Sequence, residues 1–136
     1  MEPSEQIIDK LAWTHIVDGK LLSTRSKGQS KYNIPGGKRK TNEADTQTLF
    51  REINEKLHIE IQFSSLNFIG IFEAQTDSHE PGILVHMTCY SANYKGKLRP
   101  DSEIEEMAWL HYKDRHLVSE VDKLIFDFLK DQGVLL

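Results

Sequence analysis

Residues 36–59 of this 136-residue chain read GGKRKTNEADTQTLFREINEKLHI, and they decide how the rest is understood. From residue 45 onward the apolar residues recur at helical spacing and form one stripe, made of Leu49, Phe50, Ile53 and Leu57. We therefore predict a helix over residues 45–57, capped by Asp45 or Thr46. The paired glycines before the helix indicate a turn in which the backbone can approach a ligand closely.

The predicted helix carries two carboxylates on the side away from its apolar stripe. Glu52 and Glu55 are three residues apart and share a face with Lys56. Mg²⁺ and Mn²⁺ bind carboxylate oxygens as ligands, usually together with oxygens of the substrate phosphates. The basic run over residues 38–40 adds cations that suit phosphate oxygens. Taken singly, the same residues also fit surface ion pairs and a solvated loop.

Together these residues resemble the Nudix box: glycine, five residues, glutamate, seven residues, then Arg-Glu, an aliphatic, any residue, two glutamates, any residue, glycine and an aliphatic. The match spans residues 37–59 without a gap, at Gly37, Glu43, Arg51, Glu52, Ile53, Glu55 and Ile59. Two positions depart from it. His58 replaces the glycine, a mild change because His tolerates positive φ better than most residues. Lys56 replaces a glutamate that is usually a principal metal ligand, so its ammonium would repel a cation or stand in for one.

The resemblance implies a Nudix-type α+β fold, with a mixed β-sheet sandwiched between helices, and hydrolysis of a nucleoside diphosphate linked to another group. Gly37 would offer its carbonyl to the metal, with Glu52 and Glu55 as the surviving ligands of the box. One of these two glutamates would also act as general base, and Arg51 would orient Glu43 or Glu55. A bound Mg²⁺ or Mn²⁺ would activate water and neutralise phosphate charge.

The resemblance also implies roles for residues outside the helix. Gly36 would lie against the substrate, and Lys38 and Arg39 would hold its phosphate tail. Members of the family often add an acidic metal ligand from a late loop. Glu103 is the first choice here and Glu106 the second, because both precede the strand that contains Trp109.

Strand-like runs surround the central helix. Asp18-Gly19 separates two of them, over residues 11–17 and 20–25, which is a strong hairpin signal. Further strands are expected over residues 66–74, 83–94 and 107–110, with a polar loop over 77–82. This order of strands and helices is typical of an α+β domain, here one domain over residues 1–136.

The last element is expected to be an amphipathic helix over residues 118–130. Its inward side chains are predicted to be Val121, Leu124, Ile125 and Phe128. Trp13 and Trp109 lie in strand-like runs, and we expect both in the core.

The amino-acid composition limits the kinds of molecule that the protein is expected to bind. The chain has 17 Lys plus Arg against 21 Asp plus Glu, a net charge of −4, which argues against binding a nucleic acid polymer. With Cys89 as the single cysteine, no internal disulfide can form, as suits a reducing compartment. The acidic N-terminus and the lack of a long apolar run predict neither a signal peptide nor a membrane span. We expect a cytoplasmic protein that binds a small nucleotide, alone or as a homodimer.

Two functions of different class remain. The first is a metal-dependent hydrolase of free nucleotides, of the house-cleaning type, with activity attenuated by Lys56. The second is a nucleotide-binding or regulatory module in which Lys56 has removed turnover. The enzyme is favoured because five of the six polar or glycine positions of the box up to residue 56 are kept.

Overall fold

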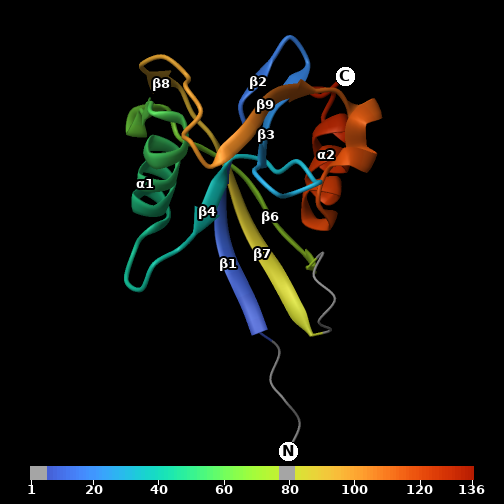
Figure 1. Cartoon of the computed structure of the whole chain (residues 1–136), viewed down its shortest axis with the longest axis horizontal. Helices are drawn as coiled ribbons and strands as arrows, with labels where there is room; N and C mark the ends of the chain where they lie inside the picture. Colours follow the sequence, from blue (N-terminus) through green and yellow to red (C-terminus); the bar gives the residue numbers. More distant parts are fainter. Residues whose placement is uncertain (1–5, 77–81) are drawn as a thin grey trace, which may run out of the picture.

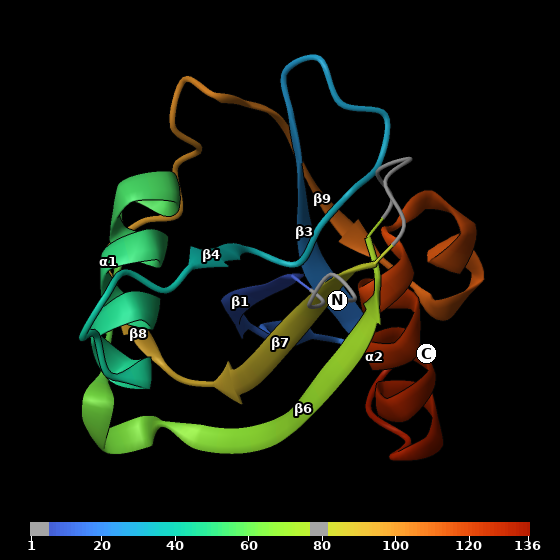
Figure 2. The ribbon, with the colours of Figure 1, turned by 90° about the horizontal axis from the view of Figure 1, so that it is seen from below.

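β1 (Gln6–Trp13) separates two hydrophobic cores, because its alternate side chains point to opposite faces of the sheet. Leu11 and Trp13 are fully buried in the core that contains residues of α1 (Asp45–Leu57), and Ala12 is fully buried in the core that contains residues of α2 (Glu120–Asp131). In the computed structural model, which describes residues 6–76 and 82–136, the two helices lie on opposite sides of the β-structure (Figures 1 and 2). The predicted α+β fold is confirmed.

The main sheet is mixed and has the strand order β4-β1-β7-β6. β1 pairs in parallel with β7 (Ile83–Ser91) and antiparallel with β4 (Gly36–Lys38), and β6 (Asn67–Gln75) pairs antiparallel with β7. A second sheet holds β2 (Ile16–Val17), β3 (Lys20–Ser26) and β9 (Ile104–Leu110). The short strands β5 (Glu60–Ile61) and β8 (Tyr94–Lys95) pair with each other, and 3₁₀ helices cover Phe63–Ser65 and Tyr112–Leu117.

α1 has the predicted bounds. Its apolar stripe of Leu49, Ile53 and Leu57 is fully buried, as the spacing predicts. The predicted cap is wrong: Ala44 is the N-cap residue, and its N–H donates to Gln47 Oε1 at 2.8 Å. His58 ends the helix with φ of 59°, the left-handed conformation expected there.

The two glycine-containing signals have different outcomes. The Asp18-Gly19 hairpin is confirmed, with φ of 53° and 77° at the turn between β2 and β3. The predicted glycine turn at residues 36–37 is wrong, because both residues belong to strand β4, and neither has a positive φ. A Cβ on Gly36 would lie 1.9 Å from the Leu11 carbonyl oxygen, so this glycine allows two strands to approach closely.

The inward face of α2 is rotated from the predicted one. Its buried residues are Val121, Asp122, Ile125, Phe126 and Leu129. Leu124 is 40% exposed, so its predicted inward position is wrong. Trp13 is in the core as expected, but Trp109 is 39% exposed, with its ring against that of His15.

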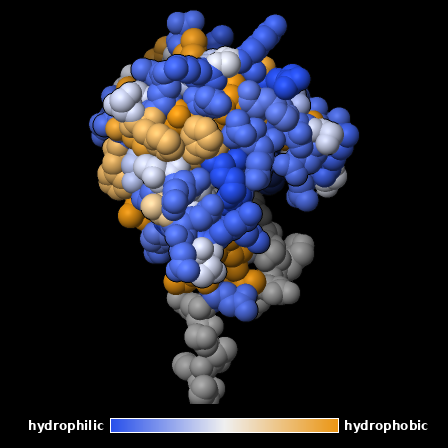
Figure 3. Space-filling view, turned by 90° about the vertical axis from the view of Figure 1, so that its left-hand side faces the viewer, coloured by the Kyte–Doolittle hydropathy of each residue, from blue (hydrophilic) through white to orange (hydrophobic). Residues whose placement is uncertain are grey.

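The surface on the α1 side is mostly hydrophilic, with hydrophobic atoms exposed at mid-height and again at the lower end of the view (Figure 3). Neither helix in the described residues, 6–76 and 82–136, has the length and apolarity needed to span a bilayer. The polar loop expected over residues 77–82 lies outside the described residues except for Gly82.

Candidate functional site

The Glu52 carboxylate lies directly against the backbone of Gly37. A Cβ on Gly37 would be 2.2 Å from both Cδ and Oε2 of Glu52, so only a glycine leaves room for this contact. The Glu52 side chain is 13% exposed. Helix α1 and strand β4 therefore place a largely buried carboxylate beside the polypeptide chain, at the point where the sequence predicts a glycine-lined site.

Arg51 joins three glutamates of the helix and of the loop before it. Its Nε and Nη2 each donate to Glu43 at 2.8 Å, and its Nη1 donates to Glu52 Oε1 at 2.9 Å. The same Nη1 lies 3.7 Å from Glu55 Oε2. Hydrogen bonds from Arg51, and after these from the Lys40 N–H and the Thr48 hydroxyl, lower the pKa of Glu43 to about 2, so this carboxylate stays ionised. Arg51 thus orients Glu43 and Glu52, with the more exposed Glu55 nearby.

Lys56 turns its ammonium inward, away from solvent. It donates a hydrogen bond to the Gly36 carbonyl oxygen and lies 3.5 Å from Glu52 Oε2. A carbonyl oxygen and a carboxylate are also groups that could serve as ligands of a metal cation. In this chain the cation between them is a lysine side chain.

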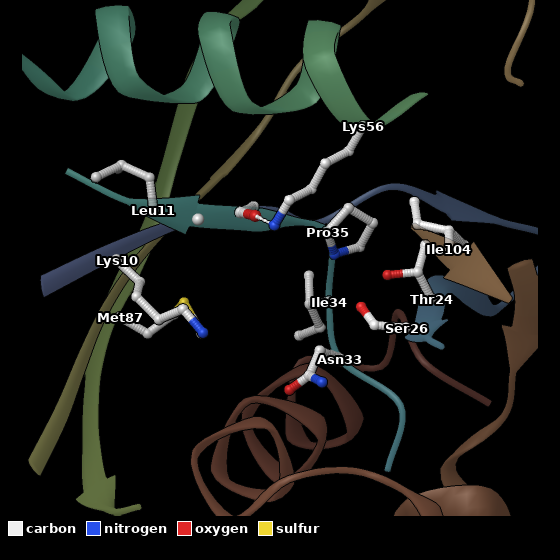
Figure 4. Close-up of a pocket in the computed structure, with 12 residues that line it drawn as sticks. Lys10, Leu11, Thr24, Ser26, Asn33, Ile34, Pro35, Lys56, Met87 and Ile104 are labelled. Carbon is white, nitrogen blue, oxygen red and sulfur yellow. Dashed lines mark hydrogen bonds between the residues drawn. The ribbon is translucent and has the colours of Figure 1, made fainter. Parts of the chain in front are cut away.

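A cavity of about 130 Å³ opens beside this ammonium (Figure 4). Its lining comes from β1, β3, the segment before β4, β4 itself, the end of α1, and single residues of β7 and β9. Lys10 also points into it, and burial lowers the pKa of Lys10, an effect that the carboxylate of Asp122 opposes. A second cavity of about 260 Å³ shares Lys10, Asn33 and Met87 with the first. The two spaces are therefore neighbours.

The basic run before α1 is divided between two uses. The Arg39 guanidinium donates to Asp9 at 2.8 Å, to Asp45 at 2.6 Å and to the Glu43 carbonyl at 3.1 Å. These bonds fasten the loop to β1 and α1, which favours a structural role for Arg39. Lys38 is exposed and lines the second cavity, where it can meet a ligand.

The late acidic residues lie immediately before β9 and within it. Glu103 is exposed and its carbonyl accepts a hydrogen bond from the Lys27 N–H at 2.9 Å. Glu106 accepts a hydrogen bond from the Tyr32 hydroxyl and lies 3.7 Å from Arg25. Within residues 6–76 and 82–136, no three Asp, Glu, His or Cys side chains form a cluster that would hold a metal. The structure thus brings Glu52 and Glu55 to one guanidinium.

Sequence reasoning missed Lys10 and Asp122. Asp122 is fully buried, and one of its carboxylate oxygens accepts the Ile34 N–H at 2.8 Å. A charged residue in an apolar strand, or in the apolar stripe of a helix, is the only local signal for either. Their proximity to the cavity depends on contacts between distant parts of the chain.

Comparisons with known proteins agree with this geometry. The chain matches the model of the NUDIX domain over residues 13–131. Comparison with curated proteins gives no match.

Among solved structures, the chain is similar to the ORF135 protein of E. coli, with TM-score 0.74, 19% identity, and coverage of 93% of this chain and 91% of that chain. It is also similar to the MutT protein from Methanosarcina mazei Go1, with TM-score 0.77, 15% identity, and coverage of 97% and 99%. A putative nudix hydrolase family member from Chromobacterium violaceum gives TM-score 0.72, 22% identity, and coverage of 96% and 80%. At these identities the similarity establishes the fold.

Proposed function

Because this chain belongs to the Nudix family, we propose that it is a hydrolase that cleaves the diphosphate linkage of a nucleoside di- or triphosphate, or of a related nucleotide, in a metal-dependent reaction. The observation that carries the proposal is the set of contacts around Glu52. Gly37 presses against this carboxylate, Arg51 donates to it, and Lys56 lies beside it. A carboxylate held in place next to basic residues suits activation of water near a diphosphate. We further propose that the chain acts as one Nudix domain.

The donors present suit a divalent ion shared with the substrate. Glu52 and Glu55 supply two carboxylates near one face of α1, and Mg²⁺ usually takes one or two carboxylates together with substrate phosphates. Mn²⁺ would use the same donors, and exposed Glu103 is the proposed late ligand. When bound, the ion would lower the pKa of a water molecule and neutralise charge on the phosphates.

The side chains of the protein then have separate tasks. The carboxylate of Glu52 or Glu55 accepts a proton from a water molecule, and the oxygen of that water molecule attacks phosphorus. The bond from that phosphorus to the bridging oxygen breaks, and the leaving phosphate keeps the electron pair. Arg51 holds the Glu52 carboxylate in place through the 2.9 Å hydrogen bond. Lys38, on the edge of the second cavity, stabilises phosphate charge.

The test is a panel of nucleoside di- and triphosphates with Mg²⁺, Mn²⁺ or EDTA, followed by phosphate release. We expect turnover with a divalent ion, and loss of at least about a hundredfold in Glu52→Gln, because a neutral amide can neither accept the proton nor bind the ion well. Thermal unfolding of the variant should match wild type, which separates loss of chemistry from loss of fold. Near-normal turnover of Glu52→Gln with Mg²⁺ would remove Glu52 from the site.

A second candidate function rests on Lys56. Because its ammonium occupies the space between Gly36 and Glu52, the chain fits a nucleotide-binding or regulatory module as well. Nucleotide binding without turnover, with every divalent ion tried, would select this function.

A further inference from the structure

The cavity beside Gly36 has an unusual charge for a site next to catalytic carboxylates. Its two charged lining residues are Lys10 and Lys56, and none of its lining residues is acidic. Figure 4 shows the two lysines approaching the space from different elements, Lys10 from β1 and Lys56 from α1. A small cavity that places two ammonium groups on its wall favours an anion.

Lys56 is held so that it still has a donor to offer. An ammonium has three N–H donors. The hydrogen bond to Gly36 and the ion pair with Glu52 engage two acceptors in the described part of the chain. One N–H therefore remains for a ligand.

Neutral donors line the opposite side of the same cavity. Thr24 and Ser26 turn their hydroxyl groups toward it, and Asn33 also lines it (Figure 4). In residues 6–76 and 82–136, none of these three side chains makes a hydrogen bond to another residue. They are free to donate to oxygen atoms of a ligand, as the hydroxyls and amides of phosphate sites do. At about 130 Å³, the space is several times the roughly 30 Å³ share of one water molecule.

We propose that this cavity is an anion site that binds a phosphoryl group through Lys10, Lys56 and the three neutral donors, without a divalent cation. The inference rests on the proposed function in one respect only, which is the identity of the molecule that carries the phosphoryl group. That molecule is a nucleotide diphosphate. Lys56 supplies the positive charge between Gly36 and Glu52, so binding and turnover have different metal requirements. Binding proceeds without metal, and hydrolysis needs the ion held by Glu52 and Glu55.

The experiment is calorimetric titration of the full chain with inorganic pyrophosphate, once in EDTA and once in Mg²⁺. We expect wild type to bind in EDTA with an affinity within about fivefold of that in Mg²⁺. Lys56→Gln should weaken binding in EDTA by at least about tenfold, because a charged hydrogen bond to the ligand is lost. Lys97→Gln is the charge-matched control, since Lys97 is exposed and lies outside the cavity, and its affinity should equal that of wild type.

Several results would overturn the inference. They are binding of pyrophosphate only with Mg²⁺, equal affinity of Lys56→Gln and wild type in EDTA, or binding of orthophosphate without binding of pyrophosphate. The wild-type comparison stands even where a variant does not fold. Failure of the proposed function is distinct from these results, because it would appear as absent nucleotide hydrolysis while pyrophosphate still binds in EDTA.

Discussion

Gly37→Ala adds one methyl group at the closest approach of β4 to α1, and its effect can be worked out from the structure. The new Cβ would lie 2.2 Å from Cδ and Oε2 of Glu52. Non-bonded carbon atoms rest about 3.5 Å apart, so the carboxylate has to withdraw by about 1 Å. The backbone itself accepts alanine, because φ of Gly37 is not positive. The substitution therefore displaces the proposed catalytic side chain and leaves the strand able to form.

A displacement of about 1 Å at a reacting group costs about a hundredfold in rate, or about 2.7 kcal/mol of transition-state stabilisation. We expect turnover of the best nucleotide in the panel to fall by that factor in Gly37→Ala, with little change in the midpoint of urea unfolding.

Two control variants test whether the effect of Gly37→Ala comes from the displacement of Glu52 and not from a general effect of adding a methyl group. Gly36→Ala should unfold the protein at lower urea, because its Cβ would meet the Leu11 carbonyl oxygen at 1.9 Å in the paired strand. Gly28→Ala should cost about 1 kcal/mol of stability, because φ is +81° there, and should leave turnover unchanged, because no atom lies within 4 Å of the added Cβ. Turnover of Gly37→Ala within threefold of wild type would show that the position of Glu52 does not matter for catalysis.

Two further predictions concern the charges around Arg51 and Lys56. Lys56→Glu changes the local charge from +1 to −1 and adds a carboxylate four residues after Glu52, so calorimetry should show tighter Mg²⁺ binding, and pyrophosphate binding in EDTA should be lost. Turnover should rise by at least about tenfold if Lys56 only attenuates a hydrolase, and should fall if Lys56 holds the substrate phosphates during the reaction. Unchanged metal affinity and an unchanged rate would place Lys56 outside the site. Because the pKa of Glu43 falls from 4.5 in the unfolded chain to about 2 in the folded one, its ion pair with Arg51 stabilises the fold above pH 4.5 and is lost as the pH falls to 2. Urea unfolding should show wild type more stable than Glu43→Gln at pH 7, with a difference that shrinks between these two pH values, and a difference independent of pH would contradict the assignment.

Local patterns in the sequence were sufficient for the parts of the fold that depend on neighbouring residues. Helix α1 could be predicted to the residue. The helical spacing of Leu49, Ile53 and Leu57 also indicated which of its faces is buried. The left-handed conformation of His58 could be predicted because the helix has to end there. Strand β4 could not, because two glycines carry no side-chain pattern, and the strand exists only through its pairing with β1.

The contacts of the site were harder to predict because they join distant residues. The sequence suggests Arg39 as a phosphate ligand because it follows the glycines, but in the structure its guanidinium is paired with Asp9, which lies 30 residues earlier in the chain. The same limit applies to Lys10, which reaches the cavity from a strand that reads as part of the core. The spacing of the Nudix box shows which residues gather around Glu52, and it does not show which of them are already paired.

The position of Lys56 bears on whether this site has decayed or has changed its chemistry. A lysine that replaced a metal ligand without a new role would extend into water, where its side chain keeps about 2 kcal/mol of conformational entropy. Here the side chain is 31% exposed, and its ammonium contacts the Gly36 carbonyl and the Glu52 carboxylate. Hydrogen bonds to a charged group contribute about 1.5–3 kcal/mol each, enough to offset that loss. The energetic balance therefore favours a lysine retained as a fixed cation. A site of this kind keeps its affinity for phosphate when metal is removed, and that is the property in which this chain should differ from a Nudix hydrolase with two adjacent glutamates.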